Sequence, residues 1–130
     1  MTNLTKRFAA FKRAKQLSPG SYSALIKKVK LLDNGNYRWD MILTGGEVEG
    51  IQVSQLNVCN TEGGMSMLFQ NLELLGIDGE WEEVQSQLQT ISDWSIEIQV
   101  VHSEQLDRSG NPYVNVYLTK DMRPKTEMVG

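Results

Sequence analysis

The sequence predicts a mainly β, α+β protein in which three strands, a helical region and two further strands follow one another. Three observations lead to this fold class. Apolar and polar residues alternate in five separate stretches, which is the period of two that strands show. Asn34-Gly35, between the first two stretches, is among the strongest short signals for a hairpin. Between the third and fourth stretches the apolar spacing changes to three and four, which indicates helix.

The first predicted element is a basic N-terminal helix over residues 3–17, where Leu4, Phe8 and Phe11 form one apolar stripe. A Pro-Gly pair ends it. We expect residues 1–18 to pack both phenylalanines on the domain. The alternative is that the cations of this helix contact phosphate groups.

Three strands follow, over residues 22–32, 37–43 and 51–58. Trp39 belongs to the apolar set of the second strand, so we expect it in the core and its neighbour Arg38 to point outward.

Strict alternation divides the first strand into two faces. Ile26 and Lys28 lie on one of them, and Lys27 and Val29 lie on the other.

The helical region contains two segments. The first runs over residues 65–75 and ends at Gly76, a typical C-terminal cap. The second runs over residues 80–91 and has acids in its first turn, where they suit the helix dipole. Its Trp81 falls on the apolar spacing, and we expect Trp81 and Trp94 to be core residues.

Two strands, over residues 94–100 and 113–118, complete the pattern, and a polar loop over 107–112 connects them. We expect residues 121–130 to form a flexible tail.

Three strands, a helix and two strands is the order of an OB-fold, a small five-stranded barrel with its helix between the third and fourth strands. We therefore predict an OB-fold-like barrel over residues 19–120, with the order strand, strand, strand, helix, second helix, strand, strand. The segment 80–91 is then an addition to the fold. A five-stranded sheet with helices on one face is the structural alternative.

Composition excludes several classes of protein. The 130 residues are 40% hydrophobic and 22% charged, as in ordinary globular domains, and no apolar run approaches the roughly 18 residues of a membrane span. The basic N-terminus lacks the apolar segment of a secretory signal, so we expect a cytoplasmic protein that does not enter a membrane. Cys59 is the single cysteine, which excludes an internal disulfide and a cysteine-based zinc site.

Charge is segregated along the chain, although the net charge is only -3. Residues 1–40 hold nine Lys and Arg against two acids, residues 41–107 hold twelve acids and no Lys or Arg, and residues 108–130 hold four Lys and Arg against two acids. A fold that brings the two basic ends together presents a positive surface to nucleic acid. The alternative is that these charges only solvate strand and helix faces.

Catalytic chemistry is hard to assemble from these residues. Cys59 and His102 are the only candidates for a nucleophile and base pair, and Cys59 lies in a predicted strand without a neighbouring cation. The Gly-Gly pairs lack the Lys and Ser/Thr of a phosphate-binding loop. We therefore expect neither an enzyme nor a cofactor or metal site.

Aromatic and basic residues recur together near the two hairpins. A base stacked on an aromatic ring gains on the order of 1–3 kcal/mol whatever its identity, and nearby cations neutralise the phosphates. This combination predicts a site for single-stranded nucleic acid, and the alternative for the tyrosines is cross-strand packing. The candidate residues are Lys28, Lys30, Tyr37, Arg38, Arg108, Tyr113, Tyr117 and Lys120.

The order of several short motifs resembles a family of bacteriophage OB-fold proteins that bind single-stranded DNA. The motifs are Pro19-Gly20-x-Tyr22, Asn34-Gly35-Asn36, Gly46 with Gly50, Phe69-x-x-Leu72-x-x-Leu75-Gly76-Ile77 and Asn111-Pro112-Tyr113-x-Asn115. The resemblance spans about residues 18–120. The family commonly has basic residues in its third and fourth strands, whereas this chain has the neutral or acidic Gln52, Gln55, Glu97 and Gln99.

The resemblance implies sequence-independent binding of single-stranded DNA during phage replication or recombination, in the cytoplasm of an infected bacterium. Phage recombination or replication proteins are the implied protein partners, and the sequence leaves a homo-oligomer open. The alternative is a protein-interaction module, a phage structural or accessory protein that does not bind nucleic acid.

Overall fold

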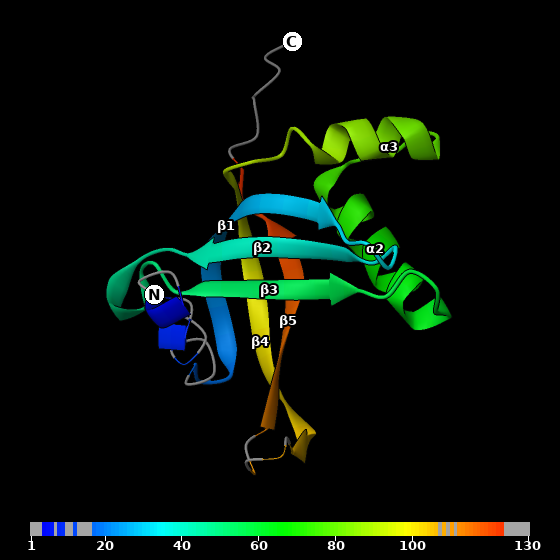
Figure 1. Ribbon diagram of the computed structural model, residues 1–130. Helices are drawn as coiled ribbons and strands as arrows, with labels where there is room; N and C mark the ends of the chain where they lie inside the picture. Colours follow the sequence, from blue (N-terminus) through cyan, green and yellow to red (C-terminus); the bar gives the residue numbers. More distant parts are fainter. Residues whose placement is uncertain are drawn as a thin grey trace.

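Five antiparallel strands form one sheet in the order β3-β2-β1-β4-β5 (Figure 1). The computed structural model describes residues 4–6, 8–9, 12, 17–106, 108, 110 and 112–123. The strands are β1 (Gly20–Leu31), β2 (Tyr37–Leu43), β3 (Gln52–Asn57), β4 (Trp94–Leu106) and β5 (Pro112–Asp121). Between β3 and β4 lie the helices α2 (Glu62–Leu75) and α3 (Trp81–Leu88), and a short 3-10 turn η1 (Gly46–Val48) precedes β3. The predicted α+β class and the order of strands and helices are confirmed.

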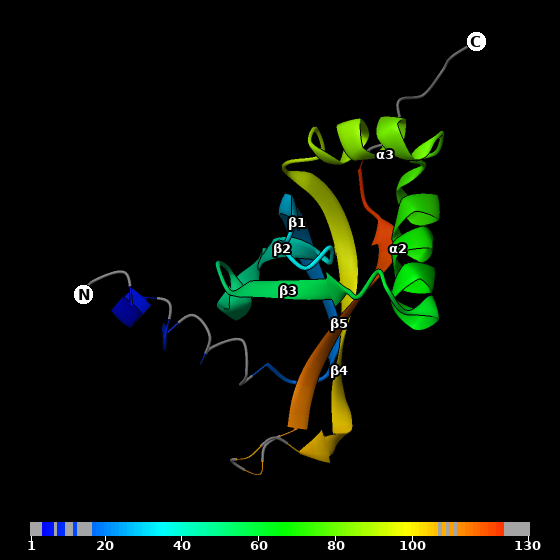
Figure 2. The same cartoon turned by 45° about the vertical axis from the view of Figure 1, so that its right-hand side comes forward.

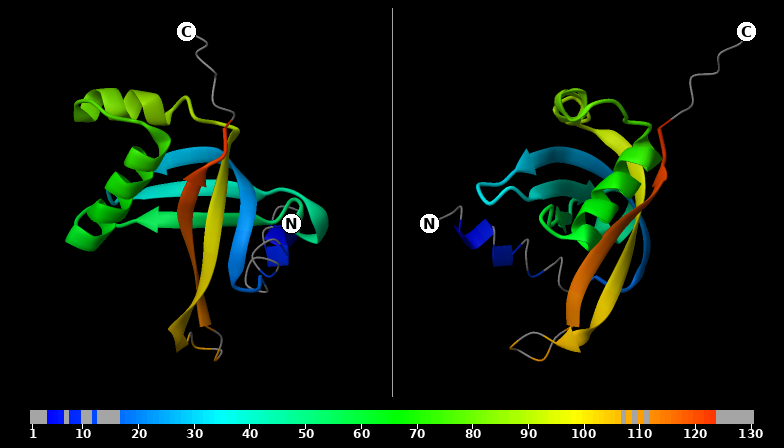
Figure 3. Two further views of the ribbon diagram at one scale, coloured as in Figure 1. Left: turned by 180° about the vertical axis from the view of Figure 1, so that it is seen from behind. Right: turned by 90° about the vertical axis from the view of Figure 1, so that its right-hand side faces the viewer.

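The sheet is strongly twisted, so that β4 and β5 cross behind β2 and β3 (Figure 1) and in front of them when the molecule is seen from behind (Figure 3). β1 belongs to both halves, because its first part pairs with β4 and its second part pairs with β2. α2 runs beside β5 and α3 crosses its end (Figure 2). The core lies between the two halves of the sheet and the helices.

A bulge at Lys27 changes the faces of β1. Ile26 pairs with Met41, and Lys28 pairs with the residue that precedes Met41, so Lys27 is one residue too many. Because of this extra residue Val29 returns to the face of Ile26, and both side chains are buried. The prediction that they lie on opposite faces is wrong, since an alternating pattern does not reveal an inserted residue.

The three tryptophans occupy three different environments. Trp39 is fully buried, as predicted. Trp94 is only partly buried against the core. Trp81 is 45% exposed, so its assignment to the core is wrong. Its ring packs nearly perpendicular to the Tyr37 ring, with the ring centroids 5.8 Å apart, and leaves much of its surface in solvent. A helical spacing that places residues on one face does not say how far that face is covered.

Leu17 ties the N-terminal segment to the sheet. Its side chain is buried, and its carbonyl oxygen accepts a hydrogen bond of 2.8 Å from Nε2 of His102 on β4. Phe8 is 65% exposed, so the expectation that it packs on the domain is wrong. Phe11, which we expected to pack with it, lies outside the described residues.

A network of buried amides joins the two edge strands of the sheet. On β3, Asn57 accepts a hydrogen bond from Nε1 of Trp39 at 2.6 Å and donates one to Oε1 of Gln55 at 3.2 Å. The same Oε1 accepts a second bond, of 2.7 Å, from Asn71 on α2. Nε2 of Gln55 donates to the carbonyl oxygen of Val116 on β5 at 2.8 Å. The network therefore connects β2, β3, α2 and β5.

These side chains take the place of a backbone ladder. In the described part of the chain no strand pairing joins β3 to β5, so the sheet is open along this seam and the predicted closed barrel is not formed by strand pairing. Gln55, Asn57 and Asn71 are all buried, and every buried side-chain nitrogen and oxygen among the described residues has a partner. Buried polar groups without partners are costly, so the network stabilises the fold only as a complete set.

Tight packing at Gly64 fixes the start of α2. Its backbone N–H donates to Oγ1 of Thr61, the N-cap residue. A Cβ atom at this position would overlap the carbonyl oxygen of Val58, whereas one at the neighbouring Gly63 would meet nothing within 4 Å. Only glycine therefore allows α2 to approach the end of β3 this closely.

Two adjacent glycines provide a matched test of this packing. We expect Gly64→Ala to lower the free energy of unfolding by at least about 1–3 kcal/mol, because the methyl group forces α2 away from Val58. Gly63→Ala is the control and is expected to stabilise the protein by up to about 1 kcal/mol, because alanine favours helix. Urea denaturation measures both values, and equal effects of the two substitutions would contradict the proposed packing.

A second prediction concerns the amide network. We expect Asn57→Leu to cost about 1–3 kcal/mol of stability, because the indole N–H of Trp39 loses its acceptor in the core. Gln52→Leu, an exposed position on the same strand, should change stability by less than about 0.5 kcal/mol. Chemical denaturation followed by tryptophan fluorescence tests both variants. A tolerated Asn57→Leu would show that the network contributes little.

Candidate nucleic-acid interface

Three of the predicted cations gather on the outer face of β1 and β2. Lys30 pairs with Arg38, and Lys28 pairs with Asp40, so these four residues form a square across the two strands. The bulge at Lys27 determines this arrangement, because it sets which residues of β1 face outward beyond it. We call Lys28, Lys30, Arg38 and Asp40 the β1–β2 patch.

The hairpin turn before β2 positions the patch. Gly35 has a φ of 87°. The backbone N–H of Leu32 donates to the carbonyl oxygen of Asn36, and the N–H of Gly35 donates to the carbonyl oxygen of Leu32, which closes the loop. Oδ1 of Asn36 also accepts a bond of 3.3 Å from the backbone N–H of Cys59, which links this loop to the segment before α2. The predicted turn at Asn34-Gly35 is therefore confirmed, and a side chain holds it against the rest of the fold.

The cations of the patch differ in how freely they could bind a phosphate group. Nε and Nη2 of Arg38 donate to the carboxylate of Asp40 at 2.8 and 3.2 Å, and both side chains are more than a third exposed. Exposed ion pairs of this kind are worth little in water, so a phosphate can replace the carboxylate. Lys28 and Lys30 are exposed and form no ion pair with any residue that the structure describes. The four residues carry a net charge of +2.

Tyr37 does not belong to this surface. It is only 3% exposed, because it follows the inward alternation of Trp39 and because α3 covers it. Its hydroxyl oxygen accepts a bond of 3.1 Å from Nε2 of Gln85, and Trp81 packs against its ring. The prediction that Tyr37 stacks on a base is corrected, since neither face of a buried ring is accessible.

The second group of candidates lies on β4 and β5. Tyr113 and Tyr117 are 47% and 39% exposed, and the outward position of Tyr117 opposite Gln99 follows the predicted alternation. Lys120 is exposed opposite Glu97. Arg108 is exposed in the turn that connects the two strands. These residues therefore lie along the hairpin of β4 and β5, whose turn end projects beyond the rest of the sheet (Figure 1).

The structure separates the two groups. Tyr117 is opposite Gln99, which is opposite Ser21 on β1, whereas the β1–β2 patch begins beyond the bulge. Lys30 lies nine residues further along β1 than Ser21, about 30 Å along a strand. Seven of the eight predicted residues thus lie on two surfaces of one twisted sheet and not in a single groove, and the eighth, Tyr37, is buried beneath the sheet.

Sequence reasoning missed three exposed apolar side chains near these surfaces. Leu56 on β3 pairs with Arg38 and extends the patch to the edge of the sheet. Val101 and Leu106 are exposed on β4. The alternation of β3 could have indicated Leu56, because this apolar residue falls on the outward set of the strand, between the inward Gln55 and Asn57.

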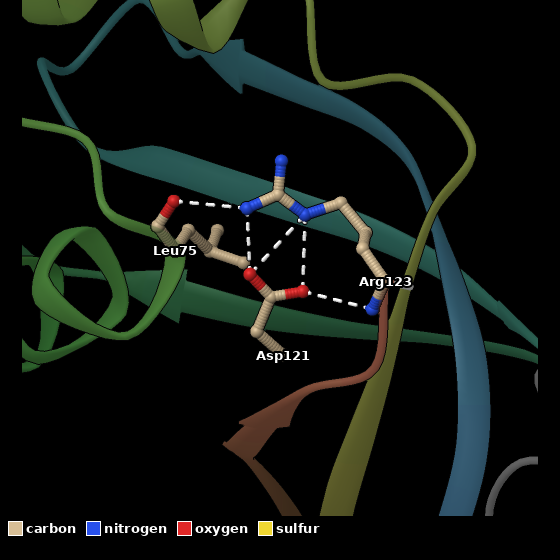
Figure 4. A network of polar contacts seen from close by, with 3 residues as sticks. All are labelled: Leu75, Asp121 and Arg123. Atoms are coloured by element: carbon tan, nitrogen blue, oxygen red, sulfur yellow. Dashed lines mark hydrogen bonds and ion pairs between the residues drawn. The ribbon is translucent and has the colours of Figure 1, made fainter. Parts of the chain in front are cut away.

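Arg123, one of the two basic residues of the C-terminal segment 121–130, is engaged within the protein (Figure 4). Arg123 donates to the carboxylate of Asp121 at 2.6 Å and to the carbonyl oxygen of Leu75, at the end of α2, at 3.1 Å. Its guanidinium group also lies 3.5 Å from the centroid of the Trp94 ring. The prediction of a flexible tail over residues 121–130 is wrong for residues 121–123, because β5 continues to Asp121 and Arg123 is fixed in place. Residues 124–130 lie outside the described residues.

This contact shifts two pKa values in opposite directions. Hydrogen bonding from Arg123 lowers the pKa of Asp121 below its ordinary value of 3.8, against the opposing effect of burial. Hydrogen bonding to Asp121 raises the pKa of Arg123. The pair remains charged at neutral pH and gives no free cation for nucleic acid.

The candidates for catalysis are held apart in structural contacts. Nε2 of His102 is bonded to Leu17, and Sγ of Cys59 lies 3.5 Å from the carbonyl oxygen of Asn57. Among the residues described, no group of three or more His, Cys, Asp and Glu side chains is placed to hold a metal ion. The described helices are also too short or too polar to span a bilayer.

Neither a protein-family model nor a curated protein matches this sequence. The residues and their geometry are therefore the basis of any functional conclusion.

The Asp121–Arg123 pair leads to a prediction for acid unfolding. Because the pKa of Asp121 is lower in the folded protein, the pair stabilises the fold above the unfolded pKa of about 3.9, and this stabilisation is lost as the pH falls through the lower folded value. We expect Asp121→Asn to reduce stability at pH 7 and to flatten this part of the curve of stability against pH. Denaturation from pH 7 to about pH 2 measures it. An unchanged curve would contradict the role of the pair.

Proposed function

We propose that the protein binds single-stranded DNA without base specificity. The observation that carries this proposal is the β1–β2 patch, in which two exposed lysines and an exchangeable arginine lie on neighbouring strands in a chain whose overall charge is negative. Clustered cations on one sheet face suit a phosphate backbone and do not read bases. The process that the sequence resemblance suggests is phage DNA replication or recombination.

The arrangement of the strands supports an OB-fold as the finer description of the domain. β1 is shared between the two halves of the sheet, a helix follows β3, and the network at Gln55 brings the edge strand β3 to β5 where a barrel would close. In such a fold, the loops between the first two and the last two strands flank the binding face. These are the turn at Asn34-Gly35 and the turn that carries Arg108.

The two surfaces suggest different tasks in holding a strand. Lys28, Lys30 and Arg38 would neutralise phosphates, and Arg38 would exchange its bonds to Asp40 for bonds to a phosphate oxygen. Tyr117 offers an exposed ring for a base, and stacking accepts any base. A strand that touches both surfaces would follow the curved face of the sheet from the patch to the hairpin.

A protein-interaction module is the second candidate. The observation in its favour is the apolar character of the projecting hairpin, where Val101, Leu106 and Tyr117 are exposed. Exposed apolar groups on one element are typical of surfaces that bind another protein. In this case the hairpin, and not the β1–β2 patch, would carry the function.

Oligonucleotide binding tests the proposal. For three phosphate contacts we expect the logarithm of affinity to fall with that of salt at a slope of about -2, which is a loss of about 20-fold between about 50 and 200 mM. Lys30→Ala should weaken binding and reduce the size of this slope by about 0.7, the share of one phosphate contact on a single strand. Tyr117→Ala should lower affinity by about 1–3 kcal/mol if the ring stacks on a base. Fluorescence anisotropy of a labelled single-stranded oligonucleotide measures all three quantities.

Lys27→Ala is the matched control on the same strand, because the ammonium group of Lys27 is bonded to Asp93. It should weaken binding less than Lys30→Ala. Absent binding, or binding that salt does not affect, would refute the nucleic-acid proposal. Recovery of a stable protein complex that depends on Leu106 would support the second candidate.

A further inference from the structure

The N-terminal segment, residues 1–17, combines positive charge with exposed apolar side chains. It carries five basic residues and no acid: Lys6, Arg7, Lys12, Arg13 and Lys15. Residues 4–6, 8–9 and 12 are helical. Leu4 and Phe8 are both more than 60% exposed, so the described remainder of the molecule does not cover them. Large exposed apolar groups among cations are suited to a partner that is acidic and apolar.

The helix α3 presents a surface of the opposite kind. Trp81 is the first residue of the helix, and much of its ring is in solvent although the ring packs nearly perpendicular to that of Tyr37. Glu80, Glu82 and Glu83 are its neighbours, and all three are exposed. From residue 41 to residue 107 the chain has no Lys or Arg, so no cation near in sequence balances them. We call Glu80, Trp81, Glu82 and Glu83 the α3 surface.

The α3 surface is unsuited to nucleic acid, in spite of its aromatic ring. Three exposed carboxylates next to Trp81 in the sequence repel phosphate, whereas they attract a cationic segment. The side chain of Glu82 forms no hydrogen bond or ion pair with any described residue, so its charge is available to a partner. The chemistry of this surface therefore matches the N-terminal segment of the same chain.

Within one molecule, the described residues of the N-terminal segment lie apart from the α3 surface. Leu17, bonded to His102, fixes the segment near the start of β1, whereas Trp81 packs at Tyr37, which pairs with Leu31 at the end of β1. These ends are eleven residues apart, about 36 Å along the strand. The described helical residues of the segment lie on the opposite side of the molecule from α3 (Figure 2).

We propose that the N-terminal segment of one molecule docks on the α3 surface of a second copy of this chain. Leu4 and Phe8 would pack with Trp81, and the cations of the segment would lie beside Glu82. Such a contact is heterologous, because each molecule uses a different surface at each end, and it leaves one free surface of each kind for a further copy. The association requires no nucleic acid and so goes beyond the proposed function.

Sedimentation velocity of the full chain tests the proposal. We expect the average mass at low salt to rise above the monomer mass of 14.7 kDa with increasing protein concentration, and to return towards it at high salt. Phe8→Asp removes an apolar side chain from the segment that docks, and Glu82→Lys reverses one charge on the α3 surface that receives it. Each should raise the apparent dissociation constant by about tenfold or more, the effect of losing one buried aromatic contact or of replacing an attraction by a repulsion.

Mixing the two variants distinguishes a head-to-tail contact from any other. The Phe8→Asp protein retains an intact α3 surface and the Glu82→Lys protein retains an intact segment, so together they should form a one-to-one dimer and nothing larger. A symmetric interface would not be restored by mixing. Glu104→Lys is the control, because it makes the same change of charge on the hairpin, and we expect it to leave association unchanged.

Three outcomes would overturn the proposal. The first is a wild-type protein that stays monomeric at low salt, with Lys12→Glu affecting only DNA binding; the segment would then serve the nucleic acid. The second is association that neither Phe8→Asp nor Glu82→Lys weakens. The third is a mixture of these two variants that stays monomeric although the wild type associates.

Discussion

The buried amides of Gln55, Asn57 and Asn71 are the constraint on which the rest of the structure depends. They hold β3 beside β5, two strands that no backbone pairing joins among the described residues, and they bring α2 and Trp39 into the same set of bonds. These hydrogen bonds can form together only when the four elements β2, β3, α2 and β5 are correctly placed. The network therefore favours one relative position of these elements. An apolar core of the same volume would fill the space without selecting that position.

The sequence predicted the elements well because local patterns determine them. Alternation, the Asn34-Gly35 turn and the change to helical spacing located five strands and two helices, and the inward side of β2 was correct at Trp39. The errors have a different origin. The bulge at Lys27 and the contact of α3 with Tyr37 are tertiary features, and a one-dimensional period contains no information on either.

The candidate site was predicted in its residue types more successfully than in its geometry. Lys28, Lys30 and Arg38 do share a face, but the tyrosines of β5 lie on another part of the sheet. The separation arises because β1 pairs with β2 along one part and with β4 along the other, so the twist of the sheet turns the two partners apart. The order of strands in the sequence does not show how much of β1 pairs with β2 and how much pairs with β4.

The contact of Arg123 with the carbonyl oxygen of Leu75 has a practical consequence for shortening the protein. This carbonyl belongs to the last turn of α2, where helices lack internal donors. A chain cut after Lys120 would lose both this donor and the carboxylate that orients it, and the indole of Trp94 would lose its cover. The smallest stable fragment therefore extends at least to residue 123, and a purification tag belongs beyond it.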